Sequence, residues 1–282
     1  MAMDYEIEIN SENLLLPHPG GYGALRYQYR EYLAEFMGTL ILVLLGDGVV
    51  AQVSVNSGAI GSSFLSINLG FAMALMFGIY VAGPVSGAHL NPAVTLANAI
   101  LRDFPARKIP GYFVSQTLGA FVGAALVYAN YWPALNAIDG GHRSTVGPQA
   151  TAGIFATFPY PDAPIVNSVI SETLGTGMLL IGILAITDRR QKIPAYMAPI
   201  AIGTVLGSIG MSLGVMTGFA LNPARDFGPR LFTAVAGWGW EPFTARSYYF
   251  WVPIVAPFIG ALVGVFVYDT VICPLDPESE QV

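Results

Sequence analysis

Two copies of the tripeptide Asn-Pro-Ala, at 91–93 and at 222–224, carry the most informative chemistry in this chain. Asparagine is a favoured residue at the N-cap of a helix, and proline suits the first helical position because its missing N–H costs nothing there. We therefore expect Asn91 and Asn222 each to begin a helix. Each motif would then place a side-chain amide at the positive end of a helix dipole.

The helices that follow these motifs are too short to cross a membrane. The segments 91–101 and 222–232 each hold about 10 helical residues, which at a rise of about 1.5 Å cover roughly half of a hydrocarbon core of about 30 Å. Two such half-helices entering from opposite sides would meet at the midplane with their positive ends. The glycine-rich approaches, 83–90 and 214–221, are predicted to be extended, which is tolerated at that depth only in a wet cavity or inside protein.

The rest of the chain has the composition of a membrane protein. Only 11% of its residues are charged, against about 25% in soluble proteins. A large soluble core is excluded because its helices would show charged outer faces, and the long stretches 48–101, 109–138 and 193–224 contain no Asp, Glu, Lys or Arg. Six full spans are predicted, near 32–55, 64–83, 111–130, 166–187, 195–215 and 249–272.

An internal repeat relates the two halves, about 31–130 and 166–272. Glu35 and Glu172 each open a Glu-x-x-Gly-Thr motif, which is followed by a second span and then by Asn-Pro-Ala. Three spans per half is an odd number, so the second half must enter from the opposite side. Inverted repeats of this kind place the solute path at the interface between the halves.

The distribution of Lys and Arg predicts the orientation. With six spans both termini lie on one side, and that side holds eight of the 12 basic residues, so we expect it to be cytoplasmic. Residues 1–30 and 273–282 are then cytoplasmic tails, the first mostly irregular, and 131–165 is a long extracellular loop. No basic run suggests nucleic acid binding, and the single cysteine, Cys273, excludes an intrachain disulfide.

At this point the sequence resembles a known family. Ser86-Gly87-Ala88-His89-Leu90-Asn91-Pro92-Ala93-Val94-Thr95 and Gly218-Phe219-Ala220-Leu221-Asn222-Pro223-Ala224-Arg225-Asp226 are similar to the two signature loops of the major intrinsic proteins, the aquaporins and glycerol facilitators. The resemblance covers residues 31–272. It implies an all-α, right-handed bundle of six transmembrane helices and two re-entrant half-helices. It also implies a pore in each subunit and a homotetramer. We expect the protein to lie in the plasma membrane.

The resemblance also implies a selectivity filter made of Phe71, Gly210, Phe219 and Arg225. Strict water channels of the family usually carry His where this chain has Gly210, and a smaller residue where it has Phe219. The present pair resembles the glycerol-facilitator branch, although Phe71 replaces the Trp of the bacterial glycerol facilitator. Further features of that branch are Asp226, Arg230, Pro253 and Ile254.

A mechanism follows from these residue types. Phe71 and Phe219 would face the carbon chain of a polyol, Arg225 would donate to its hydroxyls while repelling cations, and Gly210 would leave room. The two Asn amides would donate to a passing oxygen at the midplane, where two positive helix ends oppose protons and cations. The resemblance implies that Glu35 and Glu172 support the two loops by accepting backbone hydrogen bonds. His89 is expected to anchor the first loop or to act as a gate rather than to bind a metal, and Gln116 is expected to be a polar tie that supports the loop. Asp47, near the outer end of the first span, has no clear role and is expected at a surface or an interface.

The sequence therefore predicts a passive channel for glycerol, water and other small neutral solutes such as polyols or urea, with no enzymatic activity, cofactor or metal. One alternative is a water-selective channel of the same family, against which Gly210 and Phe219 argue. Another is an ion-coupled transporter, which needs a titratable group in the path, whereas Glu35 and Glu172 each precede a signature loop. A scaffold protein with a vestigial pore is the third, and the intact filter argues against it.

Overall fold

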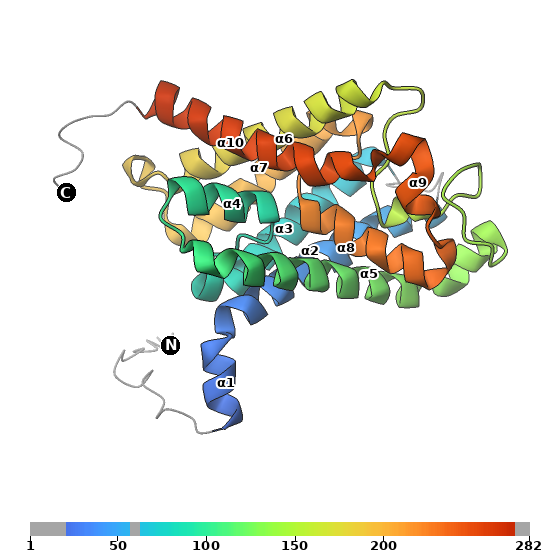
Figure 1. Cartoon of the computed structure of the whole chain (residues 1–282), viewed down its shortest axis with the longest axis horizontal. Coiled ribbons are helices and arrows are strands. Elements are labelled where there is room, and N and C mark those ends of the chain that lie inside the picture. Colours follow the sequence, from blue (N-terminus) through green and yellow to red (C-terminus); the bar gives the residue numbers. More distant parts are fainter. Residues whose placement is uncertain (1–20, 57–62, 274–282) are drawn as a thin grey trace, which may run out of the picture.

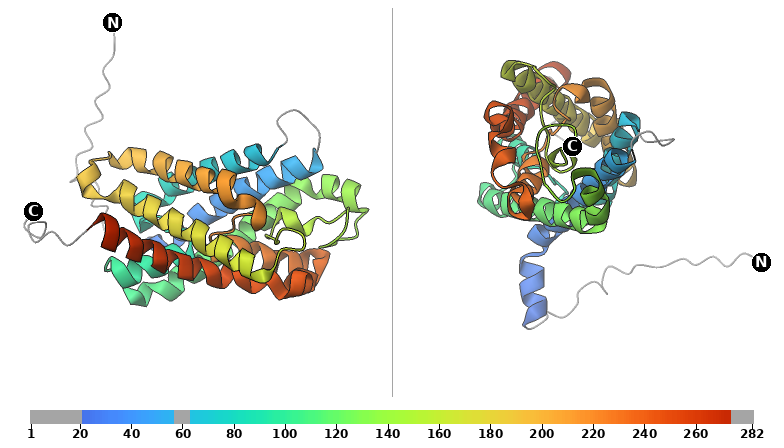
Figure 2. Two further views of the ribbon diagram at one scale, coloured as in Figure 1. Left: turned by 90° about the horizontal axis from the view of Figure 1, so that it is seen from above. Right: turned by 90° about the vertical axis from the view of Figure 1, so that its right-hand side faces the viewer.

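The computed structural model describes residues 21–56 and 63–273, and the parts of the predicted tails at 1–20 and 274–282 lie outside the described residues. Six helical stretches in the described part are long and apolar enough to cross a membrane, as predicted. They form a closed bundle around a central axis, seen end-on in the right-hand view of Figure 2. Their main helices are α2 (Arg30–Val55), α3 (Phe64–Ser86), α5 (Ile109–Asp139), α6 (Ile165–Thr187), α7 (Ala198–Leu213) and α10 (Val252–Val267).

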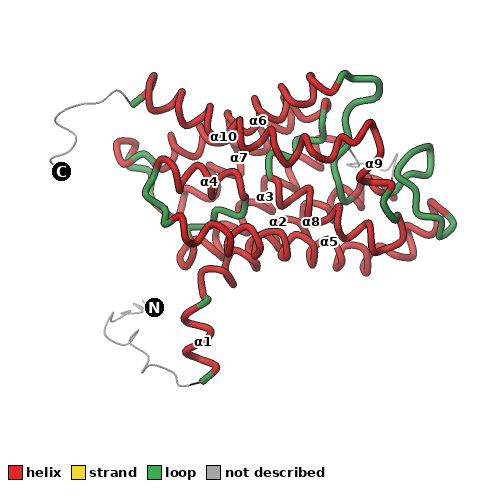
Figure 3. The backbone as a smooth tube through the Cα atoms, viewed as in Figure 1, coloured by secondary structure: helices red, strands yellow, loops and turns green. Residues whose placement is uncertain are grey.

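Two short helices, α4 (Pro92–Leu101) and α8 (Pro223–Thr233), follow the Asn-Pro-Ala motifs. They lie in opposite halves of the bundle, each between α5 and α10 (Figure 1). No strand occurs in the described part of the chain, where loops are confined to the two ends and to the approaches to α4 and α8 (Figure 3). The predicted pair of re-entrant half-helices is therefore present.

The two halves pack their helices in the same way. In the first half α5 lies against α2, because Gly119 has no side chain: a Cβ there would overlap the carbonyl oxygen of Phe36. In the second half α10 lies against α6, and a Cβ on Gly260 would overlap the carbonyl oxygen of Thr173. Phe36 and Thr173 each follow the glutamate of the repeated motif, so the backbone contact is repeated with it.

Apolar side chains cover much of the outer surface of this bundle. Met73, Phe77 and Phe266 are 61%, 50% and 67% exposed, although they lie within helices long enough to span a bilayer. Such exposure is unfavourable in water but suits contact with lipid chains. The chain is an integral membrane protein.

The structure corrects one predicted boundary and adds a short helix in the N-terminal tail. Helix α5 continues to Asp139, inside the predicted extracellular loop, even though it contains Pro133. The last turns persist because they are packed: Leu135 is fully buried in a cluster with Phe155 and Trp238. Within the N-terminal tail, predicted to be mostly irregular, α1 (Tyr22–Gln28) forms a short helix that projects sideways from the bundle (Figure 1).

The approaches to the half-helices are not extended as predicted. Helix α3 runs to Ser86, and the remaining residues of the first approach include Ala88 and Leu90 with φ of 50° and 51°. In the second approach Phe219 and Leu221 have φ of 41° and 54°. Non-glycine residues rarely adopt this left-handed region, so the surrounding contacts must hold it in place.

Candidate functional site

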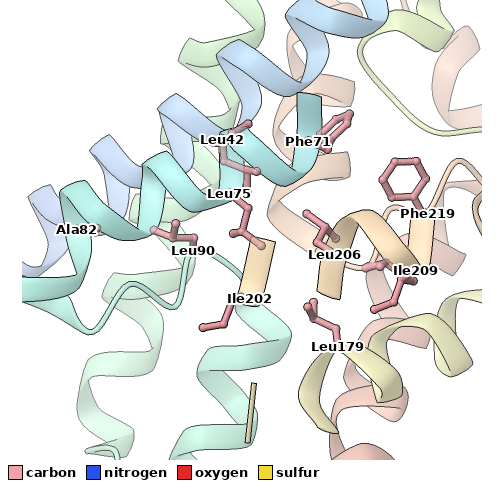
Figure 4. Packing of buried hydrophobic residues seen from close by; sticks show 12 residues of the cluster. Leu42, Phe71, Leu75, Ala82, Leu90, Leu179, Ile202, Leu206, Ile209 and Phe219 are labelled. Atoms are coloured by element: carbon pink, nitrogen blue, oxygen red, sulfur yellow. The ribbon is translucent and has the colours of Figure 1, made fainter. Parts of the chain in front are cut away.

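A cavity of about 350 Å³ runs through the bundle between the two halves. At one end it is lined by Asn98, Arg102 and Thr187, and at the other by Phe71, Phe219 and Arg225. Asn91 and Asn222 line it between these ends. Much of the remaining wall is apolar, formed by residues such as Leu75, Leu179 and Leu206 (Figure 4). The predicted pore residues that line the cavity are thus Asn91, Asn222, Phe71, Phe219 and Arg225. The other predicted pore residues do not line it: Pro92, Ala93, Pro223, Ala224 and Gly210.

Each of the two asparagines donates a hydrogen bond to the loop of the opposite half. Asn91 Oδ1 accepts from the N–H of Ala93 at 2.8 Å and so caps α4, while its Nδ2 donates to the carbonyl of Leu221 at 2.8 Å. Asn222 repeats the pattern: Oδ1 accepts from Ala224 at 3.0 Å and Nδ2 donates to the carbonyl of Leu90 at 2.7 Å. A side-chain amide has two N–H groups, so each asparagine keeps one for the cavity.

The buried glutamates hold the approaches in their unusual conformation. Both oxygens of Glu35 accept backbone N–H groups, from His89 at 2.9 Å and from Leu90 at 2.7 Å. Glu172 accepts from Ala220 at 3.0 Å and from Leu221 at 2.7 Å. Bonding successive N–H groups on one side leaves the carbonyls of Leu90 and Leu221 free to accept from the asparagines.

His89 and Gln116 complete the support of the first loop. Gln116 Nε2 donates to Glu35 at 2.7 Å and to Thr95 Oγ1 at 2.9 Å. The Nδ1 atom of His89 lies 3.2 Å from Thr95 Oγ1, and the ring packs edge-on against Phe104. His89 also lines the cavity, and no group of three or more potential metal ligands occurs in the described residues.

Three of the four predicted filter residues face one another at the end of the cavity. The rings of Phe71 and Phe219 are 5.6 Å apart at 78°, an edge-to-face pair. The guanidinium of Arg225 lies 4.6 Å from the centre of the Phe71 ring. The result is one apolar corner beside one cationic donor.

Gly210 acts on this corner from outside the cavity. A Cβ on Gly210 would overlap Asn68 Oδ1 and would lie 3.1 Å from Cε2 of Phe219. The space at Gly210 is therefore filled by the side chains of Phe219 and Asn68, and it is not open to a solute as expected. Asn68 is fully buried and its Nδ2 donates to the Phe64 carbonyl at 2.8 Å.

The expectation for Asp47 is wrong. Asp47 is fully buried, and its Oδ1 accepts from Nη1 of Arg225 at 3.1 Å. The same Nη1 donates to the carbonyl of Phe155 at 3.2 Å. A carboxylate within a span was the available signal, since such groups are costly in the membrane and usually paired, but its partner lies 178 residues away in sequence.

Sequence reasoning also missed the part played by residues 151–158. Thr157 donates to Asp226 from its N–H at 2.8 Å and from its hydroxyl at 2.6 Å, and its carbonyl accepts from Arg230 at 2.7 Å. Arg230 bonds Asp226 in turn, at 2.7 Å. The loop beyond α5 is thereby joined to α8 beside the filter, and Phe155 belongs to the same loop.

The remaining residues of the predicted glycerol-facilitator pattern lie elsewhere. Pro253 is buried in the first turn of α10, and Ile254 is partly buried beside it. Neither lines the cavity.

The family model described as "Major intrinsic protein" matches residues 25–268. The chain belongs to this family. Among related major intrinsic proteins, Aquaglyceroporin-2 of Rhizophagus irregularis is 49% identical over 264 residues, which cover 93% of this chain and 83% of that protein. Human Aquaporin-10 is 46% identical over 253 residues, 89% of this chain and 84% of that protein.

A solved structure supports the same family at the level of the fold. The X-ray structure of the aquaglyceroporin from Plasmodium falciparum matches with a TM-score of 0.78 at 36% identity, covering 88% of this chain and 98% of that one. The aquaporin-type bundle predicted from the sequence is thereby confirmed.

Proposed function

We propose that this major intrinsic protein is a passive channel that conducts glycerol, water and other small neutral solutes, and that it excludes protons and ions. The observation that carries the proposal is the end of the cavity, where Phe71 and Phe219 form an apolar corner beside Arg225. Such a site suits a molecule with carbon on one side and hydroxyls on the other. The names of the related aquaglyceroporins agree with this reading.

Permeation then proceeds as an exchange of hydrogen bonds. A solute hydroxyl that leaves water is met by donors of Arg225 while its carbon chain contacts the two rings. Farther along, the free N–H groups of Asn91 and Asn222 donate to a solute oxygen at the ends of α4 and α8. Because both positive helix ends face this point, a proton or cation is disfavoured there.

The contacts of the buried glutamates argue against coupling to protons. Glu35 accepts four hydrogen bonds, from Ser86, His89, Leu90 and Gln116, each between 2.7 and 2.9 Å. Each of these donors is engaged in holding the loop, and a proton on the carboxylate would displace one of them. These groups support the path, and they do not carry protons along it.

Further proposals follow from the basic residues and from the family. The cytoplasmic side is the end of the bundle where Arg102, Lys108 and Arg190 lie, and both termini share it. Residues 31–272 form the channel, with 1–30 and 273–282 as cytoplasmic tails. The protein forms a homotetramer in the plasma membrane, each subunit having its own pore.

Light scattering by proteoliposomes after rapid mixing tests the function. Vesicles that contain the protein should take up glycerol and water faster than empty vesicles, with the glycerol rate linear in its gradient. Imposed pH and sodium gradients should change neither rate. Water flux without glycerol flux would assign the protein to the water-selective branch, and glycerol accumulation driven by a proton gradient would refute the channel.

A further inference from the structure

Two buried arginines lie near the filter, and each has its own carboxylate. Arg230 donates to both oxygens of Asp226, and Oδ2 of Asp226 also accepts from the N–H and the hydroxyl of Thr157. Arg225 has Asp47 as its only ion-pair partner in the described part of the chain, at 3.1 Å. Asp226 is therefore occupied by Arg230 and Thr157, and the charge of the filter arginine is balanced by a residue of α2.

The contact with Asp47 also fixes the orientation of the Arg225 guanidinium group. Both hydrogen bonds of the Arg225 side chain start from Nη1, one to Asp47 and one to the carbonyl of Phe155. Within the described residues, Nε and Nη2 have no protein acceptor, while Arg225 lines the cavity. Holding Nη1 in the wall leaves the other donors of a rigid, planar group for the solute.

Helix α2 can pack against the filter because the residue before Asp47 is a glycine, Gly46. A Cβ on Gly46 would overlap the ring of Phe71, so α2 packs directly against the filter aromatic. The adjacent Asp47 is completely buried, and its Oδ2 has no hydrogen-bond partner in the described structure. Burying a carboxylate with one oxygen unsatisfied is unfavourable, so its attraction to Arg225 must compensate.

We infer that Asp47 is a specificity-determining positioning residue of the pore, which orients Arg225 and cancels its net charge. The inference rests on the proposed function, because it describes how that filter selects solutes. The filter then presents hydrogen-bond donors without a net positive charge. Small anions are not attracted to it, while neutral hydroxyl compounds still find donors.

The experiment compares water, glycerol and nitrate fluxes in vesicles normalised to folded protein. Asp47→Asn keeps the volume and one acceptor but removes the charge, so Arg225 stays in place and the filter becomes positive. Nitrate flux should rise roughly tenfold, with water flux within about twofold of the wild type. Asp47→Ala also frees Nη1, and the ratio of glycerol to water flux should fall roughly tenfold.

Two controls separate positioning from general damage. Asp139→Asn alters another buried carboxylate, paired with Arg143 away from the cavity, and should leave the nitrate flux and the glycerol-to-water ratio unchanged. In an Arg225→Ala background, Asp47→Ala should change neither readout, because the residue through which it acts is gone. An equal effect of Asp47→Ala in both backgrounds would overturn the inference, as would wild-type nitrate flux in folded Asp47→Asn.

Loss of folding is also informative. If Asp47→Asn or Asp47→Ala gives little folded protein because Arg225 is left unpaired, then adding Arg225→Ala should restore the yield. Failure to restore it would contradict the pairing. A wild-type protein that passes no glycerol would refute the proposed function alone, since yield and nitrate flux still test the pair.

Discussion

At the scale of single residues, the polar groups of the pore are divided between the wall and the path. Asn91 and Asn222 each use one amide N–H on the opposite loop, and Arg225 uses one nitrogen on Asp47 and Phe155. The wall bonds hold the side chains still, and the remaining donors replace the hydration of a passing solute. A donor fixed in advance loses little entropy when the solute arrives.

We expect Gly210 to affect the shape of the filter through its contact with Phe219. Gly210→His should push the Phe219 ring out of place and reduce water and glycerol flux together, because the new side chain collides with Phe219 and Asn68. Adding Phe219→Ala should make room for the imidazole and restore water flux. Glycerol flux should stay at least about tenfold below that of the wild type. Paired swelling assays on one vesicle batch measure both rates.

Phe219→Ala alone is the comparison for that pair. It should loosen size selection and admit larger polyols, because the corner loses one wall. Glycerol flux that recovers with water in the Gly210→His, Phe219→Ala protein would show that residue 210 does not determine the solute preference.

The loop glutamates should matter for folding more than for transport. Glu35→Gln replaces one acceptor oxygen by an NH₂ group that faces N–H donors, at a cost of about 1–3 kcal/mol for each backbone group left unsatisfied. The yield of monodisperse protein and its thermal midpoint should both fall. Glu31→Gln is the matched control, since Glu31 pairs with Lys108 at a partly exposed site and should change stability by less than about 1 kcal/mol. Normal stability of Glu35→Gln with lost glycerol flux would instead assign Glu35 a role in transport.

At the scale of elements, the half-helices depend on their neighbours. Helices α4 and α8 have only 10 and 11 residues and would be marginal alone. The two half-helices are stabilised by their caps, Asn91 and Asn222, by the approaches that the glutamates hold, and by the neighbouring long helices. The loop at 151–158 belongs to this support, because Phe155 and Thr157 bond residues of α8.

The close glycine contacts should be the sensitive points of helix packing. Gly260→Ala places a methyl group against the backbone of Thr173, which cannot move aside as a side chain could, and should cost about 1–3 kcal/mol. Gly48→Ala is the control: apart from its own helix backbone and chain neighbours, no atom of the described residues lies within 4 Å of its added Cβ, and alanine favours the helix by about 0.5–1 kcal/mol. Thermal unfolding followed by light scattering should show a lower midpoint for the first and an unchanged or higher one for the second. The opposite order would mean that the α6–α10 contact is not tight.

At the scale of the whole molecule, the inverted repeat places equivalent groups at one point from opposite sides. Leu90 and Leu221 exchange bonds with Asn222 and Asn91, so each half completes the pore motif of the other. The permeation site therefore belongs to neither half alone. The proposed orientation in the membrane rests instead on the distribution of Lys and Arg.

The single native cysteine tests that orientation. Cys273 is exposed at the C-terminal end of the last span, so a membrane-impermeant maleimide should label it only after intact cells are permeabilised. Val146 is 49% exposed in the loop beyond α5, and Val146→Cys in a Cys273→Ser background should be labelled from outside. Labelling of Cys273 in intact cells would reverse the proposed topology.

The sequence alone determined the spans, the half-helices and the repeat, because these depend on local quantities. Charge-free length decides what crosses a bilayer, and Asn-Pro decides where a helix begins. The role of the two repeated glutamates as supports of the loops was implied by the resemblance to the family. Phe71, Phe219 and Arg225 were reached only through the resemblance to the family.

Only the tertiary structure decided the surroundings of the filter. Asp47 and Arg225 are 178 residues apart, and nothing in the residues near Asp47 indicates which partner balances its charge. The space beside Gly210 is filled by Phe219 and Asn68, which come from other elements. The helix persists through Pro133 because Leu135 is packed against distant aromatic rings. Each of these outcomes depends on which side chains meet in three dimensions, and local sequence preferences do not contain that information.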